Sequence, residues 1–390
     1  MSEALPYWRL SGFYFSYFAL LGATAPFMAL YLDHLGFSAA RIGELLAIPM
    51  LMRCIAPNLW GWLGDRSGRR LAIVRLGALL TLLSFAAILY RQDYTWLALV
   101  MALHAFFWHA VLPQFEVITL DHLGPQAARY SQIRLWGSIG FIVAVVGLGW
   151  LLERLALAHY PLLVLLILAL IIASSLWVPE APARAQPEVL GAGSLWQQLR
   201  APGGWAFLLA VALMQFSHGP YYTFITLYLE RLGYERSLIG VLWALGVLAE
   251  ILMFMLMARM LARYSVRQVL LVSLLLASLR WLLLGQLADQ LAVLLLTQLL
   301  HAATFGSFHA ACVHFIRHRF AARQQGQGQA LYAALSGVGG ALGALYAGYA
   351  WHLWGAGLTF ALASLSALLA ALIIAGWLPA GARMRSPSAG

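Results

Sequence analysis

Several ionisable side chains stand within long apolar stretches of this sequence. Glu116, Glu250 and His301 can take up and release a proton, while Arg134 and Arg280 are cations that can bind an acidic group. A charge in apolar surroundings is costly, so each of these residues is a candidate for function. No nucleophile–base pair, metal-ligand spacing or phosphate-binding loop accompanies them. The sequence therefore predicts no enzyme, no metal site and no cofactor.

Aromatic residues recur beside these groups. Phe141 stands seven residues after Arg134, and Trp243 stands seven residues before Glu250. Residues at this spacing share one face of a helix. Such faces can line a cavity that takes a small solute. The alternative for Glu250 and Arg134 is a static ion pair between two helices. The same choice, between binding a solute and satisfying neighbouring polar groups, applies to Arg53, Arg280, His104, His109, His218, His301, His309 and His314.

Near-continuous apolar runs of about 20 residues carry these side chains, and each is long enough to cross a membrane as a helix. The chain is 63% hydrophobic and 10% charged, whereas soluble domains have about 25% charged residues. The short alternating segments of a β-barrel and a cleavable signal peptide are not evident. The sequence predicts an all-α polytopic membrane protein with twelve transmembrane helices, at 8–32, 39–62, 70–90, 94–120, 131–152, 160–178, 204–229, 236–258, 267–286, 290–316, 327–350 and 356–378.

A short charged loop, Gly61–Arg70, separates two of these apolar segments. Its glycines allow a close approach of helices and a turn with positive φ. Asp65 can accept hydrogen bonds at the start of the following helix. Asp121, near the end of a later segment, is the expected partner of Arg66 or Arg69. The residues of interest in this region are Gly61, Asp65, Arg66, Gly68, Arg69, Arg70 and Asp121.

All 24 basic residues are arginines, and they gather in alternate connections between the apolar segments. Because cytoplasmic loops carry an excess of positive charge, this pattern predicts that both termini are cytoplasmic. The net charge of +10 is then explained by arginine-rich cytoplasmic loops and their contact with lipid headgroups, and nucleic-acid binding is not expected. We expect a multi-pass monomer in the bacterial inner membrane.

The chain also repeats itself. A shift of 197 residues aligns Tyr31–Phe37 with Tyr228–Tyr234 and pairs His104 with His301. One offset, which holds from the first to the fifth apolar segment of each half, predicts two six-helix bundles of like topology. They would span residues 1–180 and 204–390, with a linker rich in proline and glycine at 181–203. Parallel repeats of this kind suggest alternating access, with a solute site near the membrane midplane, and a channel is the weaker alternative.

Two motifs resemble one known family. The loop Gly61–Arg70 resembles the cytoplasmic loop between helices 2 and 3 of the major facilitator superfamily (MFS) of transporters. The segment Tyr130–Phe141 is similar to the opening of helix 5 in lactose permease and in the 3-phenylpropionate permeases. Glu116 lies 18 residues before Arg134, the spacing of a glutamate–arginine pair in lactose permease. Phe141 stands where that permease has a tryptophan that stacks on the sugar.

The resemblance extends into the second half, with departures. Glu250, Arg280 and His301 fall at permease-like positions, and the stretches around Trp243 and Arg280 look more like the phenylpropionate branch than the sugar branch. The permease carries a carboxylate one turn after its histidine, where this chain has Thr304. Its helix 7 aspartates and helix 11 lysine have no counterparts. Any coupled proton therefore needs another carrier.

The resemblance implies a proton-coupled symporter that imports a small organic solute by alternating access, with an aromatic carboxylate such as 3-phenylpropionate as the first expectation. A sugar or nucleoside symporter is the alternative, and a drug/proton antiporter is another, although the segment 131–152 lacks the proline of the antiporter motif. A membrane protein that transports nothing also stays open. The expected partners are a small-molecule substrate, protons and membrane lipids. The implied roles are substrate binding for Glu116, Arg134, Phe141, Trp243 and Arg280, proton coupling for Glu250 and His301, and cytoplasmic gating for Gly61, Asp65, Arg66, Gly68, Arg69, Arg70 and Asp121.

Overall fold

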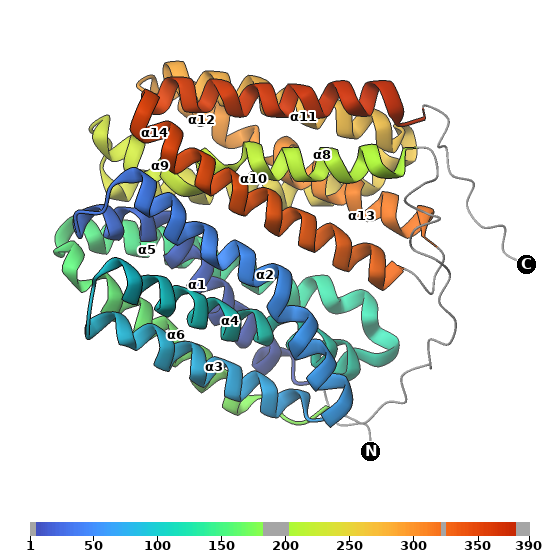
Figure 1. The fold of residues 1–390 in the computed structure, drawn as a ribbon. Helices are drawn as coiled ribbons and strands as arrows, with labels where there is room; N and C mark the ends of the chain where they lie inside the picture. Colours follow the sequence, from blue (N-terminus) through green and yellow to red (C-terminus); the bar gives the residue numbers. More distant parts are fainter. Residues whose placement is uncertain (1–4, 182–202, 321–324, 380–390) are drawn as a thin grey trace, which may run out of the picture. The chain divides into compact units, whose positions relative to one another are not determined.

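The structure, a computed structural model, describes residues 5–181, 203–320 and 325–379, and within these ranges it contains helices and no strands. Helices suit apolar segments because they satisfy every backbone hydrogen bond internally. In chain order (Figure 1) the elements are α1 Tyr7–His34, α2 Ala39–Ser67, α3 Arg70–Ala86, η1 Ala87–Leu89, α4 Tyr94–Leu123, η2 Gly124–Arg129, α5 Tyr130–Arg154, η3 Leu157–His159, α6 Tyr160–Trp177, α8 Gly204–Ser217, α9 Gly219–Arg231, α10 Arg236–Arg263, α11 Val266–Leu287, α12 Leu291–Leu299, η4 Ala302–Ser307, α13 Phe308–Arg319 and α14 Gln325–Trp377.

Each of the twelve expected segments is helical over nearly its whole length. Among the residues that the structure describes, eight helical stretches are long and apolar enough to cross a membrane by length and composition. Two of these, Tyr94–Arg154 and Gln325–Trp377, each contain two expected segments. The remaining two expected segments are α2 and the pair α8–α9. The prediction of an all-α polytopic membrane protein is confirmed.

Breaks within the helices fall at residues that explain them. The segment 204–229 is split into α8 and α9 just before Pro220, which has no N–H to continue the backbone ladder. The long helix α14 breaks at Gly355, whose φ of 73° is open to glycine. Between α12 and α13 the turn Ala302–Ser307 is π-helical. Such π-bulges often mark functional positions.

Contacts between Cα atoms group the chain into two compact units. The first unit contains residues 1–186 and 221–244, and the second contains 187–220 and 245–390. Residues 221–244 join the first unit through bonds such as that from the Arg236 backbone N–H to Glu153 Oε2, 2.7 Å. The bundle boundaries at 180 and 204 stay a prediction, and all but the ends of the linker 181–203 lies outside the described residues.

Inside each unit a few long contacts organise the helices. In the first unit α1 packs along α5 and α6, α3 lies against α4 and α6, and α2 packs against α4 (Figure 1). In the second unit α14 packs against both α8 and α11, and α11 also contacts η4 and α13. These contacts bring the candidate residues of α4 and α5 into one unit and those of α11, α12 and η4 into the other.

The close approach of α1 to α5 has a counterpart between α8 and α14. Gly140 of α5 packs against the backbone carbonyl of Phe15 in α1. In the second unit, Gly339 of α14 packs against the backbone carbonyl of Ala212 in α8. Phe15 and Ala212 are 197 residues apart, the offset of the sequence repeat. The two units therefore share this packing detail.

Candidate functional site

A buried arginine organises the polar groups of the second unit. Arg280 on α11 has no exposed surface. Its Nε donates to the Thr297 carbonyl at 2.7 Å, and its Nη1 donates to Thr304 Oγ1 at 3.0 Å. The same Nη1 lies 3.1 Å from His301 Nδ1. The guanidinium therefore links α11 to α12 and to the π-helical turn, and its neighbours here are protein groups.

His301 connects this arginine to a carboxylate. Its Nε2 lies 3.7 Å from Glu250 Oε2 on α10, and the two side chains are 7% and 18% exposed. Because a guanidinium offers only donors, His301 Nδ1 must accept, which places the proton of the neutral ring on Nε2, facing Glu250. The proton-coupling candidates Glu250 and His301 are therefore neighbours. Pairing of Glu250, in the second unit, with Arg134, in the first, stays a prediction.

The histidine also begins a stack of rings. His301 and Phe305 are stacked with their centroids 5.4 Å apart, and Phe305 and His309 follow at 6.1 Å. At the far end of the stack, His309 Nδ1 lies 2.8 Å from the Tyr332 hydroxyl. This continuous stack shows that the three residues share one face, although the chain between them passes through the π-helical turn.

In the first unit, Arg134 on α5 is surrounded by aromatic rings. Its Cζ lies 3.7 Å from the centroid of Phe18 and 5.8 Å from that of Tyr14, both on α1. Gly137 makes room for this stack, since a Cβ there would lie 2.7 Å from Arg134 Nη1. Arg134 forms no hydrogen bond or ion pair with another described residue. A guanidinium held only by aromatic faces keeps its N–H groups available for an anion.

Glu116 on α4 belongs to the same aromatic cluster but is not bonded to Arg134. Its Oε1 accepts a hydrogen bond from the Tyr130 hydroxyl at 3.1 Å. The Tyr14 ring, which faces Arg134, packs edge-on against Tyr130 at 6.4 Å. The structure thus brings the permease-like glutamate and arginine to one cluster, where each has its own neighbours.

The two aromatic candidates are packed inside the protein. Phe141 is 8% exposed and Trp243 is 6% exposed. The Trp243 indole N–H donates to Thr226 Oγ1 at 3.1 Å, and its ring lies 5.0 Å from that of Tyr221. Neither side chain presents a free face in this structure, so their contact with a solute stays a prediction.

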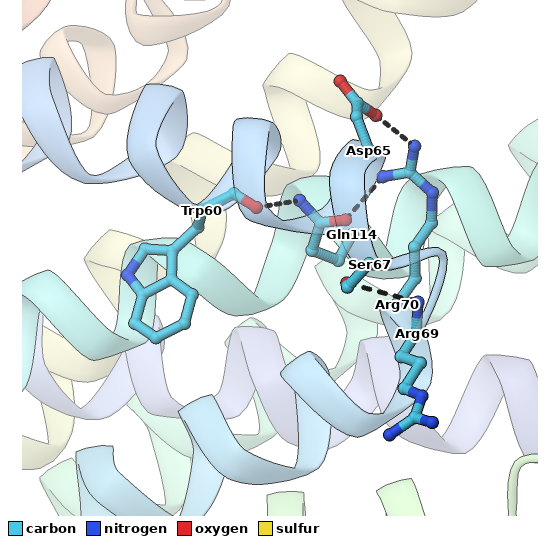
Figure 2. Close-up of polar contacts among 6 residues, drawn as sticks. All are labelled: Trp60, Asp65, Ser67, Arg69, Arg70 and Gln114. Carbon is cyan, nitrogen blue, oxygen red and sulfur yellow. Dashed lines mark hydrogen bonds and ion pairs between the residues drawn. The ribbon is translucent and has the colours of Figure 1, made fainter.

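The charged loop forms a network that ties α2, α3 and α4 together (Figure 2). Arg70 Nη2 contacts Asp65 Oδ1 at 2.5 Å, and Arg70 Nη1 donates to Gln114 Oε1 at 2.6 Å. Gln114 in turn donates through Nε2 to the Trp60 carbonyl at 3.1 Å. Gly64 packs directly against the Gln114 side chain. Gly68 ends α2 with a φ of 65°, a conformation that suits glycine.

The expected pairing of Asp121 with the loop is not formed. Asp121 makes no ion pair with Arg66 or Arg69 in this structure. Arg66 lies over the Trp62 ring, 5.7 Å from its centroid, and the Arg69 backbone N–H donates to Ser67 Oγ. The partner of Asp65 is Arg70, five residues along the same loop. The short connection between α2, which ends at Ser67, and α3, which begins at Arg70, brings these two together, whereas Asp121 lies near the end of α4.

Several residues of these clusters were not singled out in the sequence. Gln114 is an uncharged polar residue at 1% exposure, and its position in an apolar segment was the only available signal. Phe18 contacts Arg134 and Tyr130 contacts Glu116, and both contacts depend on how neighbouring helices pack. In the part of the chain that the structure describes, no group of three or more histidine, cysteine, aspartate or glutamate residues is placed to hold a metal ion.

Comparisons with known proteins agree with this arrangement. The model of the MFS_1 like family matches residues 7–362. The probable 3-phenylpropionic acid transporter of Escherichia coli (strain K12) is 31% identical over 329 residues, which cover 83% of this chain and 85% of that protein. Maltose permease of Geobacillus stearothermophilus is 28% identical over 343 residues, which cover 84% of this chain and 83% of that protein.

The fold has close counterparts among solved structures. The crystal structure of the nucleoside transporter NupG matches with a TM-score of 0.82, covering 95% of this chain and 98% of that chain. At 17% sequence identity this likeness shows the fold alone. These relatives and neighbours are transporters and not enzymes. The chain therefore belongs to the MFS_1 like family of the major facilitator superfamily, and it is a multi-pass membrane transporter.

Proposed function

We propose that this protein is a proton-coupled symporter that imports an aromatic carboxylate such as 3-phenylpropionate. The observation that carries the proposal is Arg134, a guanidinium stacked on Phe18 and bonded to no other described residue. A carboxylate would bind the open N–H groups of this cation, while the aromatic ring of the same molecule would lie against Phe18 and Tyr14. The similarity to the probable 3-phenylpropionic acid transporter supports this substrate class.

Proton coupling is assigned to Glu250 and His301. Their 3.7 Å approach lets a proton on Glu250 change the interaction between the two groups. Substrate contact is assigned to Arg134 and Glu116. It is also assigned to Phe141, Trp243 and Arg280, which are buried against other protein groups in this structure. Binding of substrate and proton would together favour the change between outward and inward access.

A sugar is the second candidate, favoured by the similarity to maltose permease. A sugar has no carboxylate to neutralise Arg134, and would instead offer hydroxyl groups to Glu116 and Arg134. The aromatic cluster can stack on a sugar ring as well as on a benzene ring. The first candidate is preferred because an exposed face of an arginine cation is best matched by an anion.

The location and topology proposed here are a monomer in the bacterial inner membrane, with both termini in the cytoplasm. The arginine-rich connections support this orientation. The network of Asp65 and Arg70 would then lie on the cytoplasmic side, where its formation and release accompany gating. Asp121, Arg66 and Arg69 would take part in gating in another state of the cycle.

Uptake by the purified protein in proteoliposomes tests the proposal. Radiolabelled 3-phenylpropionate, maltose and uridine are compared, with the interior either more alkaline than the exterior or at equal pH. We expect 3-phenylpropionate to accumulate only when the interior is alkaline, and an uncoupler to abolish the accumulation. Accumulation that ignores the gradient would rule out symport. Gradient-driven accumulation of maltose in its place would favour the second candidate, and export driven by the gradient would indicate an antiporter.

A further inference from the structure

A second arginine of the first unit, Arg53, is carried on a helix face that packs close to the same rings. Arg53, at the middle of α2, is exposed and forms no hydrogen bond or ion pair with another described residue. It shares a helical face with Pro49 and Trp60. That face contacts α4, because His109 Nε2 lies 3.3 Å from the Pro49 carbonyl and Trp60 Nε1 donates to the Phe106 carbonyl. The guanidinium of Arg53 is therefore carried on the side of α2 that meets α4.

Three aromatic side chains connect the surroundings of Arg53 to those of Arg134. We call Phe18, Tyr17 and Trp108 the aromatic wall. The centroids of Phe18 and Tyr17 are 5.2 Å apart, and Tyr17 stacks on Trp108, again at 5.2 Å. Arg134 covers the Phe18 end of this wall. At the Trp108 end lies His109, whose ring centroid is 5.2 Å from that of Trp108.

Both arginines act on this wall. The Tyr17 hydroxyl lies within electrostatic range of Arg53 and of Arg134. Arg53 is also within range of the His109 ring at the Trp108 end. Arg134 therefore lies at the Phe18 end of the wall, and Arg53 is carried on the face of α2 that contacts α4 beside the Trp108 end.

Donors outnumber acceptors around the wall. Arg53 and Arg134 are both within electrostatic range of Tyr17, and so is one carboxylate, Glu116, which is bonded to Tyr130. Trp108 adds a buried indole N–H that has no acceptor among the described residues. Unpaired cations are costly at membrane depth. An occupant with acceptor groups at both ends would satisfy donors that the protein itself leaves without partners.

We propose that Arg53 determines specificity, by binding a second anionic group at the far end of the transported aromatic acid. The preferred solutes are then aromatic dicarboxylates, with one carboxylate on Arg134, the ring against the aromatic wall and the other carboxylate on Arg53. This inference rests on the proposed function, since it takes an aromatic acid as substrate. It extends that function from a monoacid to an acid with negative charge at both ends.

The test measures binding to the purified full-length protein by isothermal titration calorimetry. The ligands are 3-phenylpropionate, 3-(4-carboxyphenyl)propionate, and 3-(4-methylphenyl)propionate, a monoacid control of similar shape in which an uncharged methyl group replaces the second carboxylate. The variants are Arg53→Met, Arg53→Lys and Arg9→Met, the last a control at another exposed arginine. We expect Arg53→Met to weaken the dicarboxylate by about tenfold or more, the loss of one charge-assisted bond, and to leave both monoacids unchanged. Arg53→Lys should restore part of the loss.

The outcomes separate this inference from the proposed function. Unchanged monoacid binding by Arg53→Met also shows that the variant is folded. If the wild-type protein binds the monoacids but binds the dicarboxylate no better than the methyl compound, the role of Arg53 is wrong and the proposed function stands. Equal weakening of all three ligands by Arg53→Met would likewise overturn it. Failure of the wild-type protein to bind any of the three acids would reject both.

Discussion

At the scale of single residues, the neighbours of His301 select one tautomer of its neutral ring. Arg280 lies at Nδ1 of His301, so the ring proton is on Nε2 and faces Glu250. Thr304, at the position where the resemblance to lactose permease implies a carboxylate, accepts a hydrogen bond from Arg280. With no carboxylate there, Glu250 is the acidic group next to His301 that can carry a proton. The coupling residue is therefore expected on α10.

Replacing Glu250 by glutamine tests this assignment. A pH gradient can drive about tenfold accumulation of substrate per pH unit for each coupled proton. We expect Glu250→Gln to abolish this accumulation. Exchange of internal for external substrate needs no net proton movement and should partly remain. Uptake and exchange assays in proteoliposomes measure both, with Glu44→Gln, at the ion pair with Arg41, as a control. Full accumulation by Glu250→Gln would move the proton site to Glu116 or His301.

The charged network of the Gly61–Arg70 loop contains contacts of unequal value. Asp65 is 67% exposed, so its pair with Arg70 is worth at most about 1 kcal/mol. Gln114 is buried, and loss of Arg70 would leave its carbonyl oxygen without that donor, at a cost of about 1–3 kcal/mol. We expect Arg70→Ala to lower the thermal unfolding midpoint more than Asp65→Asn does. Intrinsic fluorescence of the detergent-solubilised protein measures this, and equal shifts would contradict it.

At the scale of elements, glycines set the distance between the helices that repeat. Gly22 of α1 packs against the Phe141 backbone of α5. A Cβ atom at Gly22 would lie only 2.5 Å from the Phe141 carbonyl oxygen. Gly219, which is 197 residues later, packs in the same way against the backbone of Gly343 in α14. Each unit thus brings its first and fifth helices together at glycine. The repeat in the sequence corresponds to a repeat in packing.

Two alanine substitutions in α5 distinguish packing from helix propensity. A Cβ at Gly140 would collide with the Phe15 carbonyl, whereas a Cβ at Gly147 would meet nothing within 4 Å. We expect Gly140→Ala to lower the unfolding midpoint because α1 and α5 must separate. Gly147→Ala should be neutral or stabilising by about 0.5–1 kcal/mol, since alanine favours a helix more than glycine does. Thermal unfolding of the two variants side by side decides, and a stable Gly140→Ala protein would refute the packing argument.

At the scale of the whole molecule, two arginines that the sequence repeat relates have different partners. Arg70 and Arg267 are related by the 197-residue offset. Arg70 joins Asp65 and Gln114, whereas Arg267 donates to the carbonyls of Ile374 and Ala375 at the end of α14. The Asp65 network is therefore a property of the first half. Gating through this loop, as proposed, would act on one side of the pseudo-symmetric pair.

The arginine pattern makes a prediction about orientation. Fluorescent protein fused after Gly390 should fluoresce, and alkaline phosphatase fused there should be inactive, because both termini are expected in the cytoplasm. The same reporters after Gln92, in an arginine-poor connection, should behave in the opposite way. Colony fluorescence and phosphatase activity measure this. An active phosphatase at the C-terminus would reverse the proposed topology, and equal signals from both fusions would contradict the alternation.

The sequence by itself determined the helices, the repeat and most of the candidate residues. In a membrane each apolar segment satisfies its own backbone hydrogen bonds, so it forms a helix whichever neighbours it has. The high cost of a charge in apolar surroundings also makes residues such as Arg134 and Glu250 visible in the sequence alone.

Only the tertiary structure decided which groups meet. Asp65 pairs with Arg70, and Asp121 does not pair with Arg66 or Arg69 as expected. Arg280 is enclosed by protein groups, and Gln114 joins the loop to α4. These contacts depend on how each helix is rotated about its axis and how closely its neighbours approach. Rotation and approach are set by packing among segments far apart in the chain, such as the glycine contacts of α1 with α5, and helix periodicity within one segment does not contain them.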